Sequence, residues 1–167
     1  MSPADLPQVL SIAGAVHTAY PEDAAVFAER LRLYPVGCLV CESAGRVVGY
    51  SISHPWRAGA LPALNALLGE LPAQASTYYI HDIALLPEAR RVGAGAAIVA
   101  RLVEQARVAG FATVSLVAVS GTAGFWRRFG FRAVESASGD GLVVDAALVD
   151  KLRSYDDAAE FMVCDLA

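Results

Sequence analysis

The stretch ARRVGAGAAIVARLVEQA, residues 89–106, joins two adjacent arginines and two closely spaced glycines to an amphipathic helical pattern. The first turn of a helix exposes unpaired N–H groups and the positive end of the helix dipole. Glycines let a ligand come close to that backbone, and the arginines add fixed positive charge. The stretch therefore predicts a helix whose first turn binds an anion such as a phosphate.

Strand and helix patterns alternate on both sides of this helix. ATVSLVAV, residues 112–119, is almost wholly apolar, as is typical of a strand buried on both faces. TYYIHDIAL, residues 77–85, predicts the strand that precedes the glycine turn. Further strands are predicted at 37–43, 46–53, 131–134 and 160–166, and helices from Asp5, from Glu22, at 121–129 and at 145–154. A short helix is also expected within the long surface segment 57–76. These patterns predict an α/β fold with a mixed sheet.

Composition favours a single globular domain that spans residues 1–167. The chain is 56% hydrophobic and 18% charged, and its net charge is −4, so it offers little attraction to nucleic acid. No apolar run approaches the roughly 18 residues of a membrane span. The start, MSPADLPQVL, lacks the basic region of a secretory signal. We therefore expect a cytoplasmic protein with no membrane partner.

The three cysteines predict no metal site. Cys38 and Cys41 form a C-x-x-C, but no second Cys or His pair lies nearby to complete a zinc site. They fall on a predicted strand, where residues three apart face opposite ways. Together with Cys164 they are interpreted as buried free thiols, which is typical of a reducing compartment.

Two common phosphate-binding motifs do not fit the glycine turn. Gly93 and Gly95 supply two glycines of the dinucleotide fingerprint G-x-G-x-x-G, but Ile98 holds the third position. A P-loop requires Gly-Lys-Ser or Gly-Lys-Thr, and the chain has neither. Taken alone, the glycine pair is also compatible with simple packing between a strand and a helix.

Three linked motifs resemble those of the GNAT superfamily of acyl-CoA-dependent N-acetyltransferases. Residues 90–95 fit R/Q-x-x-G-x-G/A, the phosphate-loop signature of that family. YYIHDIALLP, residues 78–87, is similar to the strand that holds the pantetheine arm of coenzyme A. AGFWRRFGF, residues 123–131, is similar to the block A-x-x-F-Y-x-x-x-G-F that closes the family's core. The motifs stand in the family's order, and the resemblance extends over residues 5–166.

This resemblance implies both the fold and the cosubstrate. The implied fold has three layers, in which a mixed central sheet is flanked by helices and a splayed strand pair forms the acyl-CoA cleft. The implied cosubstrate is acetyl-CoA, with no metal. The residues expected to contact it are Ile83, Ala84 and Leu85 on the strand, Arg90, Arg91, Val92, Gly93, Ala94, Gly95 and Ala96 in the turn, and Trp126.

Acetyl transfer to an amine also requires a base, because an ammonium ion has no free lone pair. His81 is the candidate, since aralkylamine acetyltransferases carry a histidine at the position that it occupies relative to the glycine turn. Asp82 is expected to face the other way on a regular strand and to anchor a helix end or an arginine.

A proton donor for the departing CoA thiolate is less clearly marked. Trp126 stands where many family members carry a tyrosine with that role, and an indole N–H does not release its proton at useful pH. The proton is therefore expected from water or from another tyrosine, either Tyr155 or Tyr79. Trp126 is expected to pack on the pantetheine arm, and a role confined to the core stays open.

The acceptor is expected to be the amine of a small molecule or a peptide. Its candidate contacts are Tyr20, Glu22, His54, Trp56 and Tyr79, with residues 57–76 as a wall, and His17 is a weaker candidate. Amino acids, polyamines, aminoglycosides and protein N-termini all stay open as acceptors, and a homodimer is possible. The alternative function is a non-catalytic acyl-CoA-binding module that acts as a sensor or scaffold. The acidic charge disfavours a third candidate, a toxin that acetylates aminoacyl-tRNA.

Overall fold

The computed structural model describes residues 1–134, 148, 151–152 and 155–166. Its α-helices are α1 (Leu6–Val16), α2 (Ala24–Leu33), α3 (Pro87–Arg91), α4 (Ala94–Val108) and α5 (Ala123–Arg127). Its strands are β1 (Cys38–Ser43), β2 (Arg46–Trp56), β3 (Thr77–Leu85), β4 (Thr113–Ala118), β5 (Arg132–Ala133) and β6 (Glu160–Asp165). Most of the helix predicted at 145–154 lies outside the described residues.

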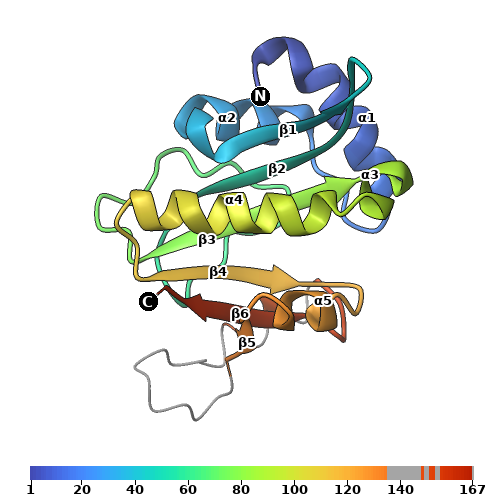
Figure 1. The fold of residues 1–167 in the computed structure, drawn as a ribbon. Helices are drawn as coiled ribbons and strands as arrows, with labels where there is room; N and C mark the ends of the chain where they lie inside the picture. The colour runs from blue at the N-terminus through green and yellow to red at the C-terminus, as the bar shows by residue number, and fades with distance from the viewer. Residues whose placement is uncertain (135–147, 149–150, 153–154, 167) are drawn as a thin grey trace.

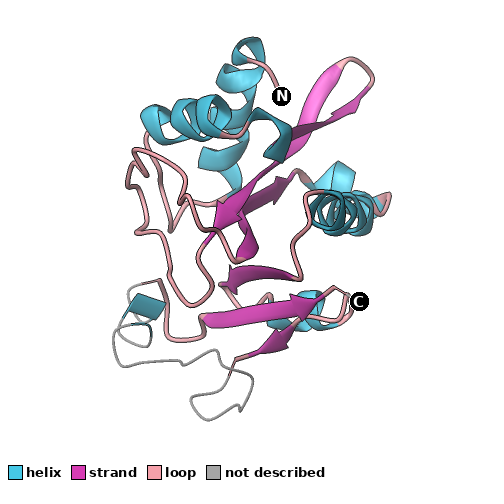
Figure 2. Ribbon diagram, turned by 90° about the vertical axis from the view of Figure 1, so that its left-hand side faces the viewer, coloured by secondary structure: helices cyan, strands magenta, loops and turns pink. Residues whose placement is uncertain are grey.

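The strands form one mixed sheet in the order β1-β2-β3-β4-β6-β5. Its pairings are antiparallel except between β3 and β4, which are parallel and are joined through α3 and α4. Figure 2 shows the sheet between α1 and α2 on one side and α4 on the other. The arrangement confirms the predicted α/β class and the three-layer architecture.

Two apolar clusters hold the helices to the sheet. On one face, Leu102 and Ala106 of α4 pack against Val114 and Leu116 of β4. On the opposite face, α1 and α2 cover β1, β2 and β3, with Phe27 of α2 among the residues at the centre of that cluster. These side chains are 2% exposed or less, so both helix layers are fixed to the sheet by burial of apolar surface.

A β-bulge interrupts β3 in its middle. The register of β2 against β3 shifts between Ile52 and Ser53, because Ile52 pairs with Asp82 whereas Ser53 pairs with Ile80. His81 is therefore the extra residue on β3. A bulge changes the direction in which the strand presents its side chains.

The core contacts of Ile80 and Ile83 show toward which face of the sheet the side chains near the bulge point. Ile80 packs in the cluster with α4, and so does Ile83, three residues later. In a regular strand, residues three apart face opposite ways. His81 and Asp82 lie between them and both face the α1–α2 side, where Ala84 also packs. The expectation that Asp82 faces away from His81 is thus wrong, because β3 is not a regular strand.

The parallel pair β3 and β4 separates part-way along its length. Pairing runs from Tyr78 opposite Val114 to Ile80 opposite Leu116, and β3 then continues to Leu85. Figure 1 shows the two strands diverging toward the end of β3 that leads into α3. This divergence is the splayed strand pair that the resemblance implies.

Residues 57–76 form a loop that contains no helix, so the short helix expected there is wrong. Pro62 and Pro72 lack a backbone donor, and Asn65 has a positive φ of 53°, which a helix does not accommodate. The loop is held from α2: Glu29 accepts hydrogen bonds from the N–H groups of Leu68 at 2.7 Å and of the following glycine at 2.9 Å. Polar contacts to α2 thus fix the loop beside the sheet.

Candidate active site

The glycine turn has the geometry of an anion-binding helix start. Gly93 has φ +80° and directly precedes α4, and its carbonyl accepts hydrogen bonds from the N–H groups of Ala96 and Ala97. The N–H groups of Ala94 and Gly95 precede any possible intrahelical acceptor, so they are free to bind a ligand. The helix of 15 residues adds the positive end of its dipole at the same point.

The glycine turn lies beside two arginines and in close contact with α5. The Nε atom of Arg90 donates to the carbonyl of Leu85 at 2.8 Å, which ties the turn to the end of β3. The side chains of Arg91 and Val92 are exposed. A Cβ atom added to Gly95 would lie 3.3 Å from the ring of Phe125, so this glycine permits the close approach of α5. The second glycine of the motif therefore serves packing.

The divergence of β3 from β4 leaves one edge of β3 open beyond the bulge. Residues 83–85 pair on their other side with residues 49–51 of β2. Their pairing with β4 has ended at Ile80 and Leu116, so this edge of β3 has no strand partner, and the carbonyl of Leu85 accepts from Arg90. An extended ligand with amide groups can bind such an edge as an added strand would.

His81 and Glu22 form a buried histidine–carboxylate pair. Its Nε2 atom lies 3.0 Å from Oε2 of Glu22, and the two side chains are only 6% and 7% exposed. The other oxygen, Oε1, accepts a hydrogen bond from the N–H of Asn65 at 3.0 Å. Burial by itself raises the pKa of Glu22, but the hydrogen bond and charge of His81 outweigh it, so that pKa lies below its ordinary value. The carboxylate thus orients one side of the imidazole ring.

A second histidine–carboxylate pair lies beside the first. Nε2 of His17, at the end of α1, is 2.8 Å from Oδ1 of Asp82, although it lacks the angle of a hydrogen bond. The hydroxyl of Tyr50 donates to Oδ2 of the same carboxylate. Burial lowers the pKa of His17, but the attraction of Asp82 and Glu22 outweighs it and leaves that pKa raised. Asp82 thus anchors a helix end, as expected, but does so next to His81.

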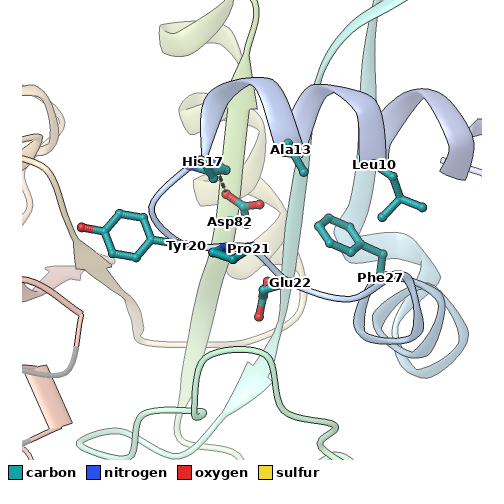
Figure 3. Close-up of a pocket in the computed structure, with 9 residues that line it drawn as sticks. Leu10, Ala13, His17, Tyr20, Pro21, Glu22, Phe27 and Asp82 are labelled. Carbon is teal, nitrogen blue, oxygen red and sulfur yellow. Dashed lines mark ion pairs between the residues drawn. The ribbon is translucent and has the colours of Figure 1, made fainter.

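Two adjoining cavities meet at these pairs. The α1 cavity has a volume of about 200 Å³. It is lined by Leu10, Ala13, Gly14, His17, Tyr20, Pro21, Glu22, Phe27 and Asp82, most of which Figure 3 labels. The β3 cavity, of about 70 Å³, is lined by His17, Tyr20, Glu22, Leu64, Tyr79, His81, Asp82, Val117, Val119 and Tyr155. Four residues line both, so His81 and the space beneath α1 belong to one site.

Three predicted tyrosines lie at the β3 cavity. The Tyr20 hydroxyl donates to Oδ2 of Asp156 at 2.5 Å, which connects the turn after α1 to the segment before β6. The Tyr155 hydroxyl donates to the carbonyl of Pro62 at 2.9 Å, and burial raises its pKa to about 12. Tyr79 is 2% exposed, and burial raises its pKa well above the ordinary value.

Three further residues that were predicted for the site, His54, Trp56 and Trp126, line neither cavity. His54 is buried, and its ring makes edge contacts with Trp56 and tilted contacts with the ring of His81. Trp126 is 8% exposed and packs edge-on against Phe125 and Phe131. The geometry thus gives Trp126 the surroundings of a core residue.

His54 makes the stability of the fold depend on pH. Burial lowers its pKa to about 3, whereas an exposed imidazole titrates near 6.5. The unfolded chain therefore binds a proton more readily than the folded chain, so stability is fully present above about pH 6.5 and falls as pH drops toward 3. The expected slope from this group is about 1.4 kcal/mol of unfolding free energy per pH unit.

Urea unfolding of the wild type and of His54→Phe between pH 5 and pH 7 measures this contribution. Phenylalanine keeps the ring contact with Trp56 and cannot bind a proton. Other titrating groups cancel in the difference, which should fall steadily below pH 6.5. A difference that stays constant over the whole range would show that His54 titrates alike in both states.

The sequence alone did not reveal the partnership of Glu22 with His81, or the place of His17 in the site. Glu22 was expected to contact substrate, and 59 positions separate it from His81. His17 was only a weaker candidate, although a histidine at a helix end just before Tyr20 and Pro21 could have suggested a residue that faces the sheet. Neither histidine–carboxylate pair has a spacing that marks it in the sequence.

In the part of the chain that the structure describes, no helix is long and apolar enough to cross a bilayer. Within the same residues, no group of three or more histidine, cysteine, aspartate or glutamate side chains has an arrangement that could hold a metal ion.

Comparison of the sequence with protein-family models gives one match, to the Acetyltransferase (GNAT) family, over residues 7–131. The match runs from the second residue of α1 to the residue before β5. A comparison with curated proteins finds no significant match.

Solved structures with the same fold include three that cover nearly all of this chain. The GphF GNAT-like decarboxylase in complex with isobutyryl-CoA has a TM-score of 0.77 and 18% identity, over 100% of this chain and 97% of its own. Naa20 of Chaetomium thermophilum with a bisubstrate analogue has a TM-score of 0.69 and 21% identity, over 99% and 84%. The ribosomal-protein-S18-alanine N-acetyltransferase of Escherichia coli has a TM-score of 0.63 and 19% identity, over 100% and 91%.

Proposed function

This chain belongs to the acetyltransferase (GNAT) family, and from that premise we propose that it transfers the acetyl group of acetyl-CoA to the amine of a small molecule or peptide. The observation that carries the proposal is the buried pair of His81 and Glu22, 3.0 Å apart, at the point where β3 and β4 diverge. A thioester held along β3 and an amine in the adjoining cavities would meet at that pair.

Coenzyme A fits the two features that flank this point. Its pyrophosphate is suited to the start of α4, where free N–H groups and the helix dipole face an anion. Its pantetheine arm has two amides that can bind the open edge of Ile83, Ala84 and Leu85. Arg90 and Arg91 add positive charge at the turn. In the proposed complex, these backbone and side-chain groups hold the cofactor.

The proposed chemistry begins with loss of the ammonium proton. His81 accepts that proton, directly or through water, while Glu22 stabilises the resulting imidazolium. The neutral nitrogen attacks the thioester carbonyl and forms the C–N bond. The C–S bond then breaks with CoA leaving as a thiolate, and the nitrogen loses its second proton to water. The proton on His81 is finally released to solvent.

We propose that the thiolate takes its proton from solvent, which receives the two protons that the amine loses. An ordinary thiol has a pKa of about 8.5, whereas burial raises the pKa of Tyr155 to about 12. Proton transfer from Tyr155 to a thiolate is therefore uphill, and the same argument applies to the buried hydroxyl of Tyr79. Trp126 lies in the core, which removes the family's usual alternative. In this scheme Tyr155 supports the cavity wall through its hydrogen bond to Pro62.

Release of CoA thiol from acetyl-CoA, measured over a panel of amines, tests the proposal. An enzyme gives sustained thiol release that depends on the added amine and yields a stoichiometric amount of N-acetyl product. Tight acyl-CoA binding without turnover of any amine would instead identify the alternative, a sensor or scaffold.

Glu22→Gln tests the coupling of the carboxylate to the base. Glutamine keeps the size and the oxygen that accepts from the N–H of Asn65, but it has no charge. Turnover is expected to fall by about tenfold, the factor associated with one hydrogen bond to a charged group. Loss of the neighbouring negative charge disfavours imidazolium, so the acidic limb of the pH–rate profile should move to lower pH. Steady-state rates between pH 5.5 and 9 would measure both changes. An unchanged acidic limb would show that the Glu22 carboxylate does not act on the base.

A further inference from the structure

The α1 cavity is larger than the β3 cavity that contains His81, and a single reacting amine does not account for it. Its volume is about 200 Å³, compared with about 70 Å³. A water molecule occupies about 30 Å³ in the liquid, so the α1 cavity has room for a short aliphatic chain. Residues of both pairs line both cavities, so the two cavities adjoin at the pairs.

The lining of the α1 cavity selects for the chemistry of such a chain. Leu10, Ala13 and Phe27 supply an apolar side. Glu22 and Asp82 supply two carboxylates whose side chains are 7% and 14% exposed. Among the described residues that line the two cavities, none is a lysine or an arginine. Even with His17 protonated against Asp82, the two carboxylates leave one excess negative charge in the lining while His81 is neutral, so an ammonium would be attracted and a carboxylate on the acceptor repelled.

Asp82 has capacity for a further hydrogen bond. A carboxylate can accept about four hydrogen bonds. The described contacts of Asp82 are the Tyr50 hydroxyl at one oxygen and His17 at the other. Figure 3 shows the carboxylate of Asp82 beneath α1, directed toward His17. An ammonium in the α1 cavity could therefore join this carboxylate without displacing Tyr50.

We propose that the acceptor is a short aliphatic diamine, which places one amine at His81 and its distal ammonium in the α1 cavity against Asp82. This inference rests on the proposed function and names the acceptor class. It favours cationic amines over free amino acids, whose carboxylate the site would repel. The apolar side of the cavity would contact the methylene groups between the two nitrogens.

Three amines of similar length provide the first test: diaminobutane, butylamine and aminobutyrate. They present the same reacting amine and differ at the other end, which is an ammonium, a methyl group or a carboxylate. The expected kcat/KM for diaminobutane exceeds that for butylamine by about tenfold to a hundredfold, the range for a hydrogen bond between charged groups. Aminobutyrate should be the poorest of the three. Diaminobutane has two equivalent amines, so a preference of only about twofold would be statistical.

Asp82→Asn tests the position of the distal ammonium. Asparagine keeps the shape and an oxygen for the Tyr50 hydroxyl but removes the charge. The ratio of kcat/KM for diaminobutane to that for butylamine is expected to fall to about two. A ratio cancels any general loss of activity in the variant, so a merely structural role for Asp82 would leave it unchanged.

Gly14→Leu tests the use of the α1 cavity. Gly14 lines the cavity from α1, and a Cβ atom added there meets no other atom within 4 Å. Glycine within a helix is also less stable than alanine by roughly 0.5–1 kcal/mol, so the leucine variant should fold. KM for diaminobutane should rise by about tenfold or more, while acetyl-CoA affinity by calorimetry stays constant. Gly14→Ala is the matched control, with a much smaller change in KM.

The outcomes separate the inference from the function on which it rests. A preference for diaminobutane that disappears in Asp82→Asn supports the inference. Amine-dependent acetylation in which aminobutyrate or butylamine equals diaminobutane would overturn it and leave the acetyltransferase function standing. Failure of all three amines, and of hydroxylamine as a small strong nucleophile, to release thiol would overturn the proposed function and the inference together.

Discussion

Replacement of His81 by glutamine is expected to lower turnover by about a hundredfold or more, the usual contribution of a general base. Glutamine approximates the length of the side chain and can still bond to Glu22, but it cannot take a proton from the acceptor amine at neutral pH. In the wild type, the rate should fall at acidic pH, because a protonated base cannot accept the proton of the amine. The variant should lose that acidic limb. Steady-state thiol release between pH 5.5 and 9 measures both effects.

Two further measurements keep this result interpretable. Acetyl-CoA affinity should change little in the variant, because the cofactor's proposed contacts are to the main chain of β3 and to the glycine turn. His81→Ala should give an equal or larger loss of turnover. Full turnover with an unchanged acidic limb in His81→Gln would make His81 structural and leave water alone to carry the proton.

Replacement of Gly93 by valine is expected to raise the dissociation constant of acetyl-CoA by about tenfold to a hundredfold. Gly93 has φ +80°, a conformation that costs a residue with a side chain roughly 1–2 kcal/mol. No protein atom lies within 4 Å of the added Cβ atom, so the side chain would project into the space that the proposed site leaves for a pyrophosphate. Calorimetric titration with CoA measures the loss.

Gly110→Val is the matched control for backbone strain. Gly110 follows the other end of α4, also has φ +80°, and likewise has no atom within 4 Å of an added Cβ atom. The two valine variants should therefore lose similar thermal stability, and only the Gly93 variant should lose affinity. Equal CoA affinity in the two folded variants would remove the glycine turn from the proposed cofactor site.

The arrangement of strands and helices was largely predictable because it depends on local patterns. The apolar run 112–119 marks β4, and residues 94–108 carry the helical spacing of α4. The glycine turn at the start of α4 could be predicted because the positive φ of Gly93 is a conformation that other residues rarely adopt, whereas the short helix α3 before it was not predicted. Residues 57–76 were mistaken for a helical segment because their leucines suggest a periodicity that Pro62 and Asn65 prevent.

The candidate site was predictable only in part, because its geometry depends on contacts between distant segments. His81 could be named from its position relative to the glycine turn. Glu22 could not be assigned to it, since the two side chains meet only when the turn after α1 folds over the sheet. The orientation of Asp82 was missed because a bulge depends on pairing with β2 and leaves no mark in residues 77–85 that alternation would reveal.

The bulge at His81 divides β3 into two stretches of opposite parity. Before it the even-numbered residues, such as Ile80, face α4, and after it the odd-numbered residue Ile83 does so. The apolar residues of β3 therefore pack as they would on a strand that is one residue shorter. The extra residue does not have to alternate between the two faces of the sheet, so an ionisable side chain can occupy this position without displacing an apolar one. A substitution that changes the acid–base chemistry at this position therefore leaves the apolar packing on both faces of the sheet intact.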